Sequence, residues 1–238
     1  EAEVMRVNAI GVANLIREAV RHNAHFIQAS SSEVYGQISD LKAITEQAPL
    51  VAKSPYTIAK IAAERFVRLH AEIDGLRFTI LRNFNTYGRA LVGSRHYVVE
   101  KAITQALEGG PIVLGASTPT RDFLWREDHV GSYMAVVDNL EAATGETFNS
   151  ATGRSVSIRE LADIVAQVVA HETGNKPCPV IFQGLDRPAE ASHLLGDASH
   201  IKERLGFVAG VSLEEGLVLA TREWAQVMGV PLLERTAK

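Results

Sequence analysis

A tyrosine and a lysine four positions apart, Tyr56 and Lys60, are the pair in this sequence best suited to catalysis. The residues around them predict a helix, because Ser54 can cap its N-terminus, Pro55 suits its first turn and apolar residues follow at helical spacing. Both side chains would then lie on one face, one turn apart. An ammonium beside a phenol favours the phenolate, so Lys60 is expected to lower the Tyr56 pKa from its usual value of about 10. Tyr56 could then exchange a proton with a substrate hydroxyl near neutral pH.

Two predicted strands must position these side chains. A buried strand over 26–29 opens into three serines, of which Ser31 lies one loop ahead of Tyr56. A second β-rich run at 78–81 leads to Asn85. Residues at the carboxyl ends of parallel strands point into the crevice in which open α/β sheets bind ligands. The alternation of helices and strands therefore predicts a doubly wound parallel sheet with these residues at one edge.

Several motifs, in order along the whole chain, resemble the extended short-chain dehydrogenase/reductases that act as nucleotide-sugar epimerases and dehydratases. The motifs are Ser-Ser-Ser-Glu-Val-Tyr-Gly at 30–36, Tyr56-x-x-x-Lys60, Arg-Asn-Phe-Asn-Thr-Tyr-Gly at 82–88, Arg-Asp-Phe at 121–123, Glu-Asp-His-Val at 127–130, Arg187-Pro188 and Leu-Gly-Phe at 205–207.

The resemblance implies an α/β fold, namely a partial Rossmann-like doubly wound parallel sheet with a smaller mixed α/β substrate-binding lobe. Residues 1–88 would be the C-terminal part of an NAD-binding Rossmann domain. Residues 89–238 would be mainly the substrate-binding lobe, with some segments returning to the Rossmann sheet.

The family binds the dinucleotide pyrophosphate on a glycine-rich turn, and this sequence contains no Gly-x-x-Gly-x-x-Gly. It opens instead on a predicted helix over 1–22. The resemblance therefore implies that the chain begins after two βαβ units, with roughly 60 or more residues of the family's NAD-binding part absent.

The resemblance also implies catalytic and cofactor-binding roles. Tyr56 would take the proton of the sugar C4 hydroxyl while hydride passes to NAD, Lys60 would bind the nicotinamide ribose, and Ser31 would donate a hydrogen bond to the same sugar oxygen. Glu33 falls where similar dehydratases place the acid that removes the C5 proton, although decarboxylases carry a similar motif and a glutamate here could simply cap the turn. Asn8 would either face the nicotinamide side of the cofactor or be an ordinary helix-packing asparagine.

Five further residues match positions that bind the nucleotide sugar in the family. Asn85 would hold a substrate phosphate, and Arg121 and Arg187 would clamp the pyrophosphate, which suits the bidentate guanidinium. Arg89 stands in place of the family's usual proline and would add a basic group near the phosphates. Ser32 matches the GDP-mannose dehydratases, in which a serine precedes the acid.

Two acidic residues beside these motifs are interpreted as structural. Asp122 is expected to orient Arg121 or to cap the neighbouring turn. Asp128 is expected to be the N-cap of a helix through Val137, an interpretation that leaves His129 without a chemical role.

Composition excludes some classes of function. Hydrophobic residues make up 46% of the chain and charged residues 22%, which is typical of a soluble globular protein. The net charge of −4 gives no electrostatic footprint for nucleic acid. Cys178 is the only cysteine, so an intrachain disulfide is excluded, and without a Cys/His cluster we expect no metal site. No apolar run is long enough to span a membrane, so a cytoplasmic protein is expected.

The leading hypothesis is an NAD-dependent 4,6-dehydratase of a GDP- or dTDP/UDP-hexose, which acts on a nucleotide-diphosphate sugar through a 4-keto intermediate. The tail at 187–197 resembles those of GDP-mannose dehydratases and favours guanine. A 4-epimerase of the UDP-glucose/galactose type and then a UDP-glucuronate decarboxylase stay open, as does a non-catalytic relative that binds RNA or protein. The resemblance also implies a homodimer through the Asn8 and Tyr56 helices, supported by small residues such as Ala13, Ala59 and Ala63.

Overall fold

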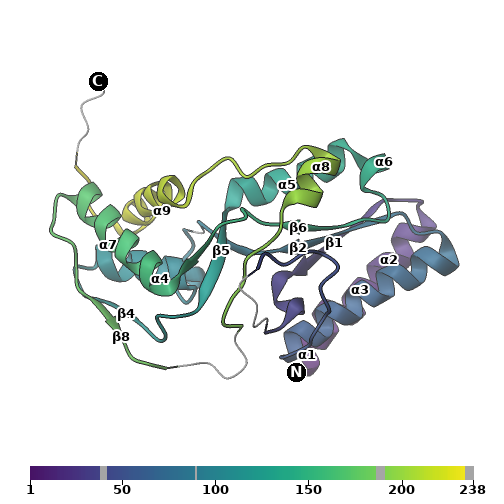
Figure 1. The fold of residues 1–238 in the computed structure, drawn as a ribbon, viewed down its shortest axis with the longest axis horizontal. Coiled ribbons are helices and arrows are strands. Elements are labelled where there is room, and N and C mark those ends of the chain that lie inside the picture. Colours follow the sequence, from purple (N-terminus) through teal and green to yellow (C-terminus); the bar gives the residue numbers. More distant parts are fainter. Residues whose placement is uncertain (38–41, 89, 186–190, 234–238) are drawn as a thin grey trace.

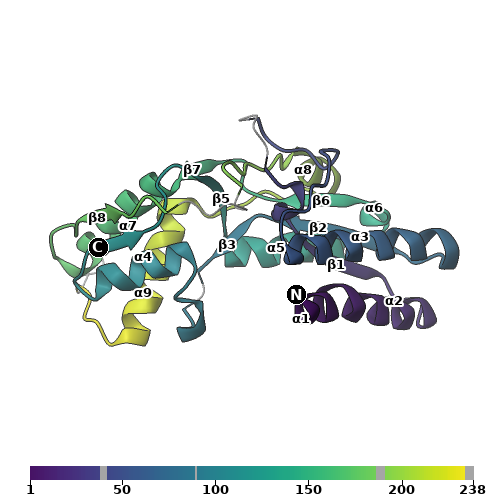
Figure 2. The ribbon, with the colours of Figure 1, turned by 90° about the horizontal axis from the view of Figure 1, so that it is seen from below.

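The computed structural model describes residues 1–37, 42–88, 90–185 and 191–233. Its elements form two parts that lie side by side in both ribbon views (Figures 1 and 2). One part is a parallel sheet covered by helices. Its elements are α1 (Ala2–Met5), the π-helix η1 (Arg6–Ile10), α2 (Gly11–Arg21), β1 (Phe26–Ser31), the 3-10 helix η2 (Ser32–Tyr35), α3 (Pro55–Asp74), β2 (Phe78–Asn83), α5 (Arg126–Asp138), α6 (Leu140–Ala143), β6 (Thr147–Ser150) and α8 (Ser199–Leu205).

The sheet of this part has the strand order β1-β2-β6, and both strand pairs are parallel. Ser31 lies opposite Asn83, and Asn83 lies opposite Ser150. The three strands therefore end at the same edge, where an open α/β sheet binds its ligands.

Helices cover both faces of this sheet. Ile16 of α2 and Val67 of α3 pack with Ile80 of β2 in one cluster, whereas Val136 of α5 packs with Leu81 of β2 in another. Since neighbouring residues of a strand point to opposite faces, α2 and α3 cover one face and α5 the other. This arrangement confirms the predicted doubly wound, Rossmann-like α/β fold.

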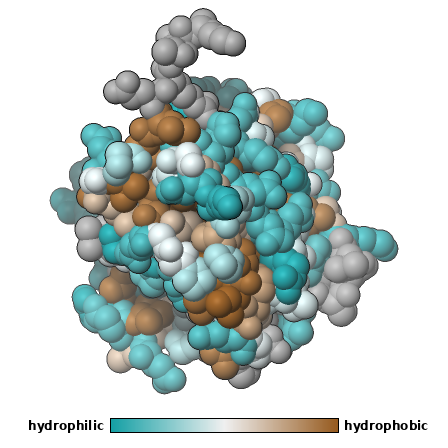
Figure 3. Space-filling model, turned by 90° about the vertical axis from the view of Figure 1, so that its left-hand side faces the viewer, coloured by the Kyte–Doolittle hydropathy of each residue, from teal (hydrophilic) through white to brown (hydrophobic). Residues whose placement is uncertain are grey.

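The second part is built from three longer helices and two small sheets. The surface at the left-hand side of Figure 1, which belongs to this part, mixes apolar and polar side chains in small patches (Figure 3). One sheet has the order β3-β5-β7, with β5 and β7 antiparallel, and the other pairs β4 with β8. The elements are β3 (Asn85–Tyr87), the 3-10 helix η3 (Val92–Ser94), α4 (Val98–Leu107), β4 (Ile112–Leu114), β5 (Thr120–Trp125), β7 (Ser155–Ser157), α7 (Ile158–Thr173), β8 (Val180–Phe182) and α9 (Leu213–Met228).

Two late elements, β6 and α8, belong to the first part, because β6 pairs with β2 and α8 packs in the same core cluster. The division at residue 88 stays a prediction. Within the described residues, no helix combines the length and the apolar character that crossing a membrane requires.

The residues around Tyr56 form the helix that the sequence predicts, with the predicted N-cap and first turn. Ser54 Oγ accepts a hydrogen bond from Thr57 N at 3.2 Å, and Pro55 occupies the first turn. The helix runs to Asp74, and Gly75 in the left-handed conformation closes it.

The prediction that Asp128 is an N-cap is wrong. Trp125 is the N-cap of α5, and Asp128 lies in the first turn. Its carboxylate accepts hydrogen bonds from Gly210 N and Val211 N, both at 2.9 Å, and so holds the loop before α9.

Candidate active site

Ser31 and Tyr56 meet at the edge where the strands of the sheet end. Ser31 is the last residue of β1, and Tyr56 lies in the first turn of α3. Their side chains lie close enough for hydrogen bonding by Ser31 to lower the pKa of Tyr56. Ser31 Oγ accepts a hydrogen bond from Glu33 N at 3.2 Å, because Ser31 is the N-cap of η2. Ser31 therefore holds the turn that carries Glu33 and lies beside the phenol of Tyr56.

Lys60 lies one helical turn beyond Tyr56 and is anchored to the sheet. Its Nζ donates to Ala29 O at 2.9 Å and lies 5.6 Å from the centroid of the Tyr56 ring. Burial lowers the pKa of Lys60, because a buried ammonium loses hydration. Three side chains from β1 and α3 are therefore brought together as the sequence predicts.

The pKa of Tyr56 is raised, chiefly by burial, which penalises the phenolate. Hydrogen bonding by Ser31 lowers this pKa, whereas the negative charge of Glu33, and that of Tyr97 when it is ionised, raise it. Lys60 is not among these influences. The expectation that Lys60 lowers the Tyr56 pKa is therefore wrong for this structure, in which the ammonium is turned to a backbone carbonyl.

Two tyrosines that the sequence did not single out lie close to Tyr56. Tyr97 is the exposed N-cap residue of α4, and its hydroxyl acts electrostatically on Tyr56. Tyr133 of α5 accepts a hydrogen bond from Asn83 Nδ2 at 2.9 Å. The pKa of Tyr133 is raised, mainly by burial and to a smaller extent by the electrostatic influence of Tyr56. Both come from elements far along the chain, so no local signal could have found them.

The other predicted site residues in the first part of the fold, Glu33, Ser32 and Asn8, differ in exposure and in hydrogen bonding. Glu33 is exposed on η2, whereas Ser32 beside it is only 3% exposed. Asn8 lies in the π-helix η1, and its Nδ2 donates to Val4 O at 3.2 Å within the same helical stretch.

Residues expected at the substrate lie on the second part of the fold. Asn85 is the first residue of β3, and its Oδ1 is buried and without a hydrogen-bond partner within the described ranges. Arg121 on β5 is 5% exposed, and its Nη1 donates to Thr120 O at 2.8 Å. Arg89 and Arg187 lie outside the described residues.

Asp122 caps the turn at 152–153, which is distant in sequence, rather than the neighbouring turn that the sequence predicts. Its carboxylate is fully buried and accepts hydrogen bonds from Thr152 N at 2.9 Å and Gly153 N at 3.0 Å.

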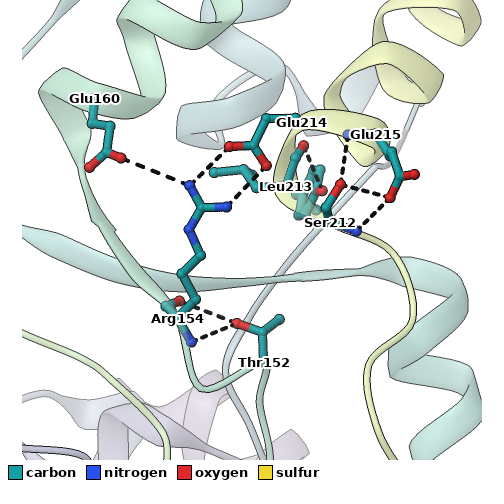
Figure 4. A network of polar contacts seen from close by, with 8 residues as sticks. Thr152, Arg154, Glu160, Ser212, Leu213, Glu214 and Glu215 are labelled. Atoms are coloured by element: carbon teal, nitrogen blue, oxygen red, sulfur yellow. Dashed lines mark hydrogen bonds and ion pairs between the residues drawn. The ribbon is translucent and has the colours of Figure 1, made fainter.

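A cavity of about 300 Å³ lies elsewhere, beside the N-terminus of α9. The polar side chains that line it, those of Thr152, Arg154 and Ser212, already have partners (Figure 4). Arg154 forms an ion pair with Glu214 at 2.9 Å, and Ser212 and Glu215 form a reciprocal helix cap. We therefore assign the candidate site to the edge with Ser31 and Tyr56. Among the described residues, no group of three or more metal-ligating side chains occurs.

The parallel sheet with a serine, a tyrosine and a lysine at its carboxyl edge defines a protein of the short-chain dehydrogenase/reductase class. The model of the family described as GDP-mannose 4,6 dehydratase matches residues 2–219, and the chain belongs to this family.

Individual relatives agree with this assignment. The chain is 29% identical over 222 residues to a dTDP-glucose 4,6-dehydratase of Streptomyces griseus, covering 92% of this chain and 64% of that protein. The dTDP-glucose 4,6-dehydratase DesIV of Streptomyces venezuelae, solved with NAD, matches with a TM-score of 0.82 and 25% identity, covering 94% of this chain and 67% of that one. A UDP-glucose 4-epimerase of Thermotoga maritima, solved with UDP-glucose, matches with a TM-score of 0.84 and 26% identity, covering 94% and 71%.

Proposed function

We propose that the protein is an NAD-dependent enzyme that modifies a nucleotide sugar through a 4-keto intermediate, and that the reaction is 4,6-dehydration. The observation that carries the proposal is the placement of Ser31, at the end of β1, beside Tyr56, in the first turn of α3, where Ser31 and Glu33 both influence the pKa of the phenol. A proton acceptor, an orienting hydroxyl and a second carboxylate are the groups that this reaction needs. The matched family and two of the three relatives above, named as 4,6-dehydratases, support the same choice.

NAD would be held in part by Lys60, Tyr56 and Asn8. An ammonium has three donors, so Lys60 can keep its hydrogen bond to Ala29 O and still donate to a ribose hydroxyl. These residues therefore fit a nicotinamide nucleotide. When bound, NAD would supply a hydride acceptor for C4 and, in its reduced form, the hydride donor for C6 that a 6-deoxy product requires.

The chain's own residues would manage the protons. Tyr56 Oη would take the proton of the C4 hydroxyl, and Ser31 Oγ would hold the same oxygen in place as the ketone forms. The C5 proton of a 4-keto sugar is acidic, so Glu33 would remove it and pass it to the C6 hydroxyl, which would leave as water. Asn85, Arg89, Arg121, Arg187 and Ser32 would contact the nucleotide sugar, and a GDP-sugar is the favoured substrate.

The test is product analysis of the full chain with NAD and, separately, GDP-mannose, dTDP-glucose, UDP-glucose and UDP-glucuronate. A 4-keto-6-deoxy sugar from one of the three neutral sugars is expected. Tyr56→Phe should lower kcat by about 10²–10⁴-fold, which is the usual contribution of a general acid–base. If the only product is an epimerised sugar, the reaction is 4-epimerisation and not dehydration. If UDP-glucuronate releases carbon dioxide, the reaction is decarboxylation.

The second candidate is 4-epimerisation, favoured by the likeness to the Thermotoga maritima epimerase. Epimerisation uses the same Ser31 and Tyr56 but has no step for Glu33. Glu33→Gln should therefore abolish dehydration and leave epimerisation intact. A Tyr56→Phe variant that keeps full biological function would instead favour the hypothesis of a non-catalytic relative that binds RNA or protein.

We further propose that the protein works in the cytoplasm as a homodimer, joined through α3 and the helical stretch that contains Asn8. What supports the dimer is a row of exposed apolar side chains on these helices. On α3 the row consists of Ile58, Phe66, Leu69 and Ile73, and on the N-terminal helices of Val7, Ile10 and Leu15.

A further inference from the structure

A buried ion pair lies between the helix that carries Tyr56 and the strands beneath it. Arg82 of β2 donates from Nε to Glu64 Oε1 at 3.0 Å and from Nη2 to Glu64 Oε2 at 2.7 Å. Glu64 is 1% exposed and Arg82 is 3% exposed. The contact is thus a bidentate pair shielded from water, the geometry in which a guanidinium fixes the direction as well as the distance of its partner.

The pair reaches directly to the elements that hold the catalytic groups. Glu64 lies on α3, one turn beyond Lys60 and two turns beyond Tyr56. Ser30, the neighbour of Ser31 on β1, donates from Oγ to Glu64 Oε1 at 2.6 Å. One carboxylate therefore connects the helix of Tyr56 to the strand of Ser31.

Arg82 extends the connection to the turn that carries Glu33. Its Nη1 donates to the hydroxyl of Tyr35, the last residue of η2, at 3.1 Å and to Glu46 O at 2.8 Å. The Tyr35 hydroxyl in turn donates to Asn149 Oδ1 of β6 at 2.6 Å. Burial raises the pKa of Tyr35 to about 12, so this hydroxyl stays a donor at neutral pH.

Stability alone is a weak reason for such a pair. Removing two charges from water costs several kcal/mol, and apolar side chains of similar volume often stabilise a protein as well or better. What an apolar core cannot supply is the directional hold on β1, η2, α3 and β6 at once.

We propose that Glu64 and Arg82 are positioning residues, whose buried pair fixes α3 against the end of β1 so that Tyr56 stays beside Ser31. This inference rests on the proposed function, in which Ser31 and Tyr56 act on the same sugar oxygen. Neither side chain touches substrate in this scheme.

The experiment compares Glu64→Gln and Arg82→Lys in the full chain with a matched control, Glu172→Gln. Glu172 is a carboxylate with 3% side-chain exposure that pairs with Arg222 at 2.7 Å in the second part of the fold. Glutamine keeps the shape but loses the charge, and lysine keeps the charge but loses the fork. All measurements are made at a temperature at which circular dichroism shows each variant folded.

Two readouts are taken. The first is the Tyr56 pKa, from the ultraviolet absorbance titration of each protein minus that of its Tyr56→Phe version, which requires no turnover. The second is kcat and KM for the nucleotide sugar that is turned over. In Glu64→Gln and Arg82→Lys we expect the Tyr56 pKa to rise by at least half a unit and kcat to fall at least tenfold, with KM changed less than threefold.

Glu172→Gln should lower the melting temperature without moving either readout. An unchanged Tyr56 pKa in both folded variants overturns the inference. Because the titration needs no substrate, a protein without the proposed activity can still give the expected pKa change, so failure of the function and failure of the positioning role are distinguishable.

Discussion

Tyr56 is subject to opposing influences from two residues of one short segment. Ser31 lowers its pKa through a hydrogen bond, and Glu33, two residues later, raises it through its negative charge. Burial raises the pKa further, so the folded protein holds the phenol protonated at neutral pH. Only the deprotonated phenol can act as a base. If Tyr56 has this role, activity should therefore increase with pH as the phenol loses its proton.

The first prediction concerns Glu33. Glu33→Gln removes the negative charge that disfavours the phenolate, so the Tyr56 pKa should fall, by about half a unit for a partly solvated pair. The absorbance titration against the corresponding Tyr56→Phe protein measures this directly. Glu72→Gln, an exposed substitution near the far end of α3, is the control and should leave the pKa unchanged. A pKa that stays the same or rises in Glu33→Gln would contradict the assigned electrostatic influence.

At the scale of the element, α3 presents two faces with different partners. Ala59 and Ala63, expected from the sequence to support a dimer, are fully buried within the chain. The exposed face carries Ile58, Phe66 and Ile73 instead, at 50%, 36% and 64% exposure. Small residues thus let the helix approach its own sheet, and the larger apolar residues remain exposed, where they would contact a second copy in the proposed dimer.

The second prediction tests this face. Phe66→Glu places a charge in the proposed interface and should weaken dimerisation at least tenfold, which corresponds to about 1.4 kcal/mol. Sedimentation equilibrium over a range of protein concentrations measures the dissociation constant. Leu219→Glu, an equally simple change at a 41% exposed leucine of α9, should leave it unchanged. A monomeric parent protein at micromolar concentration would refute the dimer.

Local signals predicted much of α3 but little of its surroundings. The cap of Ser54 and the proline beside it act within a few residues, so the sequence could place the start of the helix. The N-cap assignment of Asp128 failed because its hydrogen-bond partners, Gly210 and Val211, are distant in sequence. The same limit applies to Tyr97 and to the pair of Glu64 with Arg82, whose roles exist only after the chain has folded. Helical spacing, the end of a predicted strand and the resemblance to a family together located Ser31 and Tyr56, but the raised pKa of the phenol required the folded environment.

At the scale of the whole molecule, Asp122 joins segments that are far apart in the chain. Its Oδ1 accepts from Thr152 N at 2.9 Å and Thr152 Oγ1 at 2.7 Å, and its Oδ2 accepts from Gly153 N at 3.0 Å and Gly196 N at 3.4 Å. Gly196 packs so closely that an added Cβ would lie 2.4 Å from the Ala151 Cβ. One carboxylate therefore fastens β5 to the end of β6 and to the segment that leads into α8.

The last prediction follows from this geometry. Asp122→Asn keeps one oxygen for the two donors of Thr152 but turns an amide NH2 towards Gly153 N and Gly196 N, which are also donors. Unpaired buried donors cost about 1–3 kcal/mol each, so the free energy of unfolding should fall by about 2–4 kcal/mol. Urea denaturation at neutral pH measures the loss, and Asp163→Asn, an exposed substitution on α7, should change it by less than about 0.5 kcal/mol. If Asp122→Asn were as stable as the parent protein, the four hydrogen bonds could not be what holds these segments together, and apolar packing around Gly196 would have to do so.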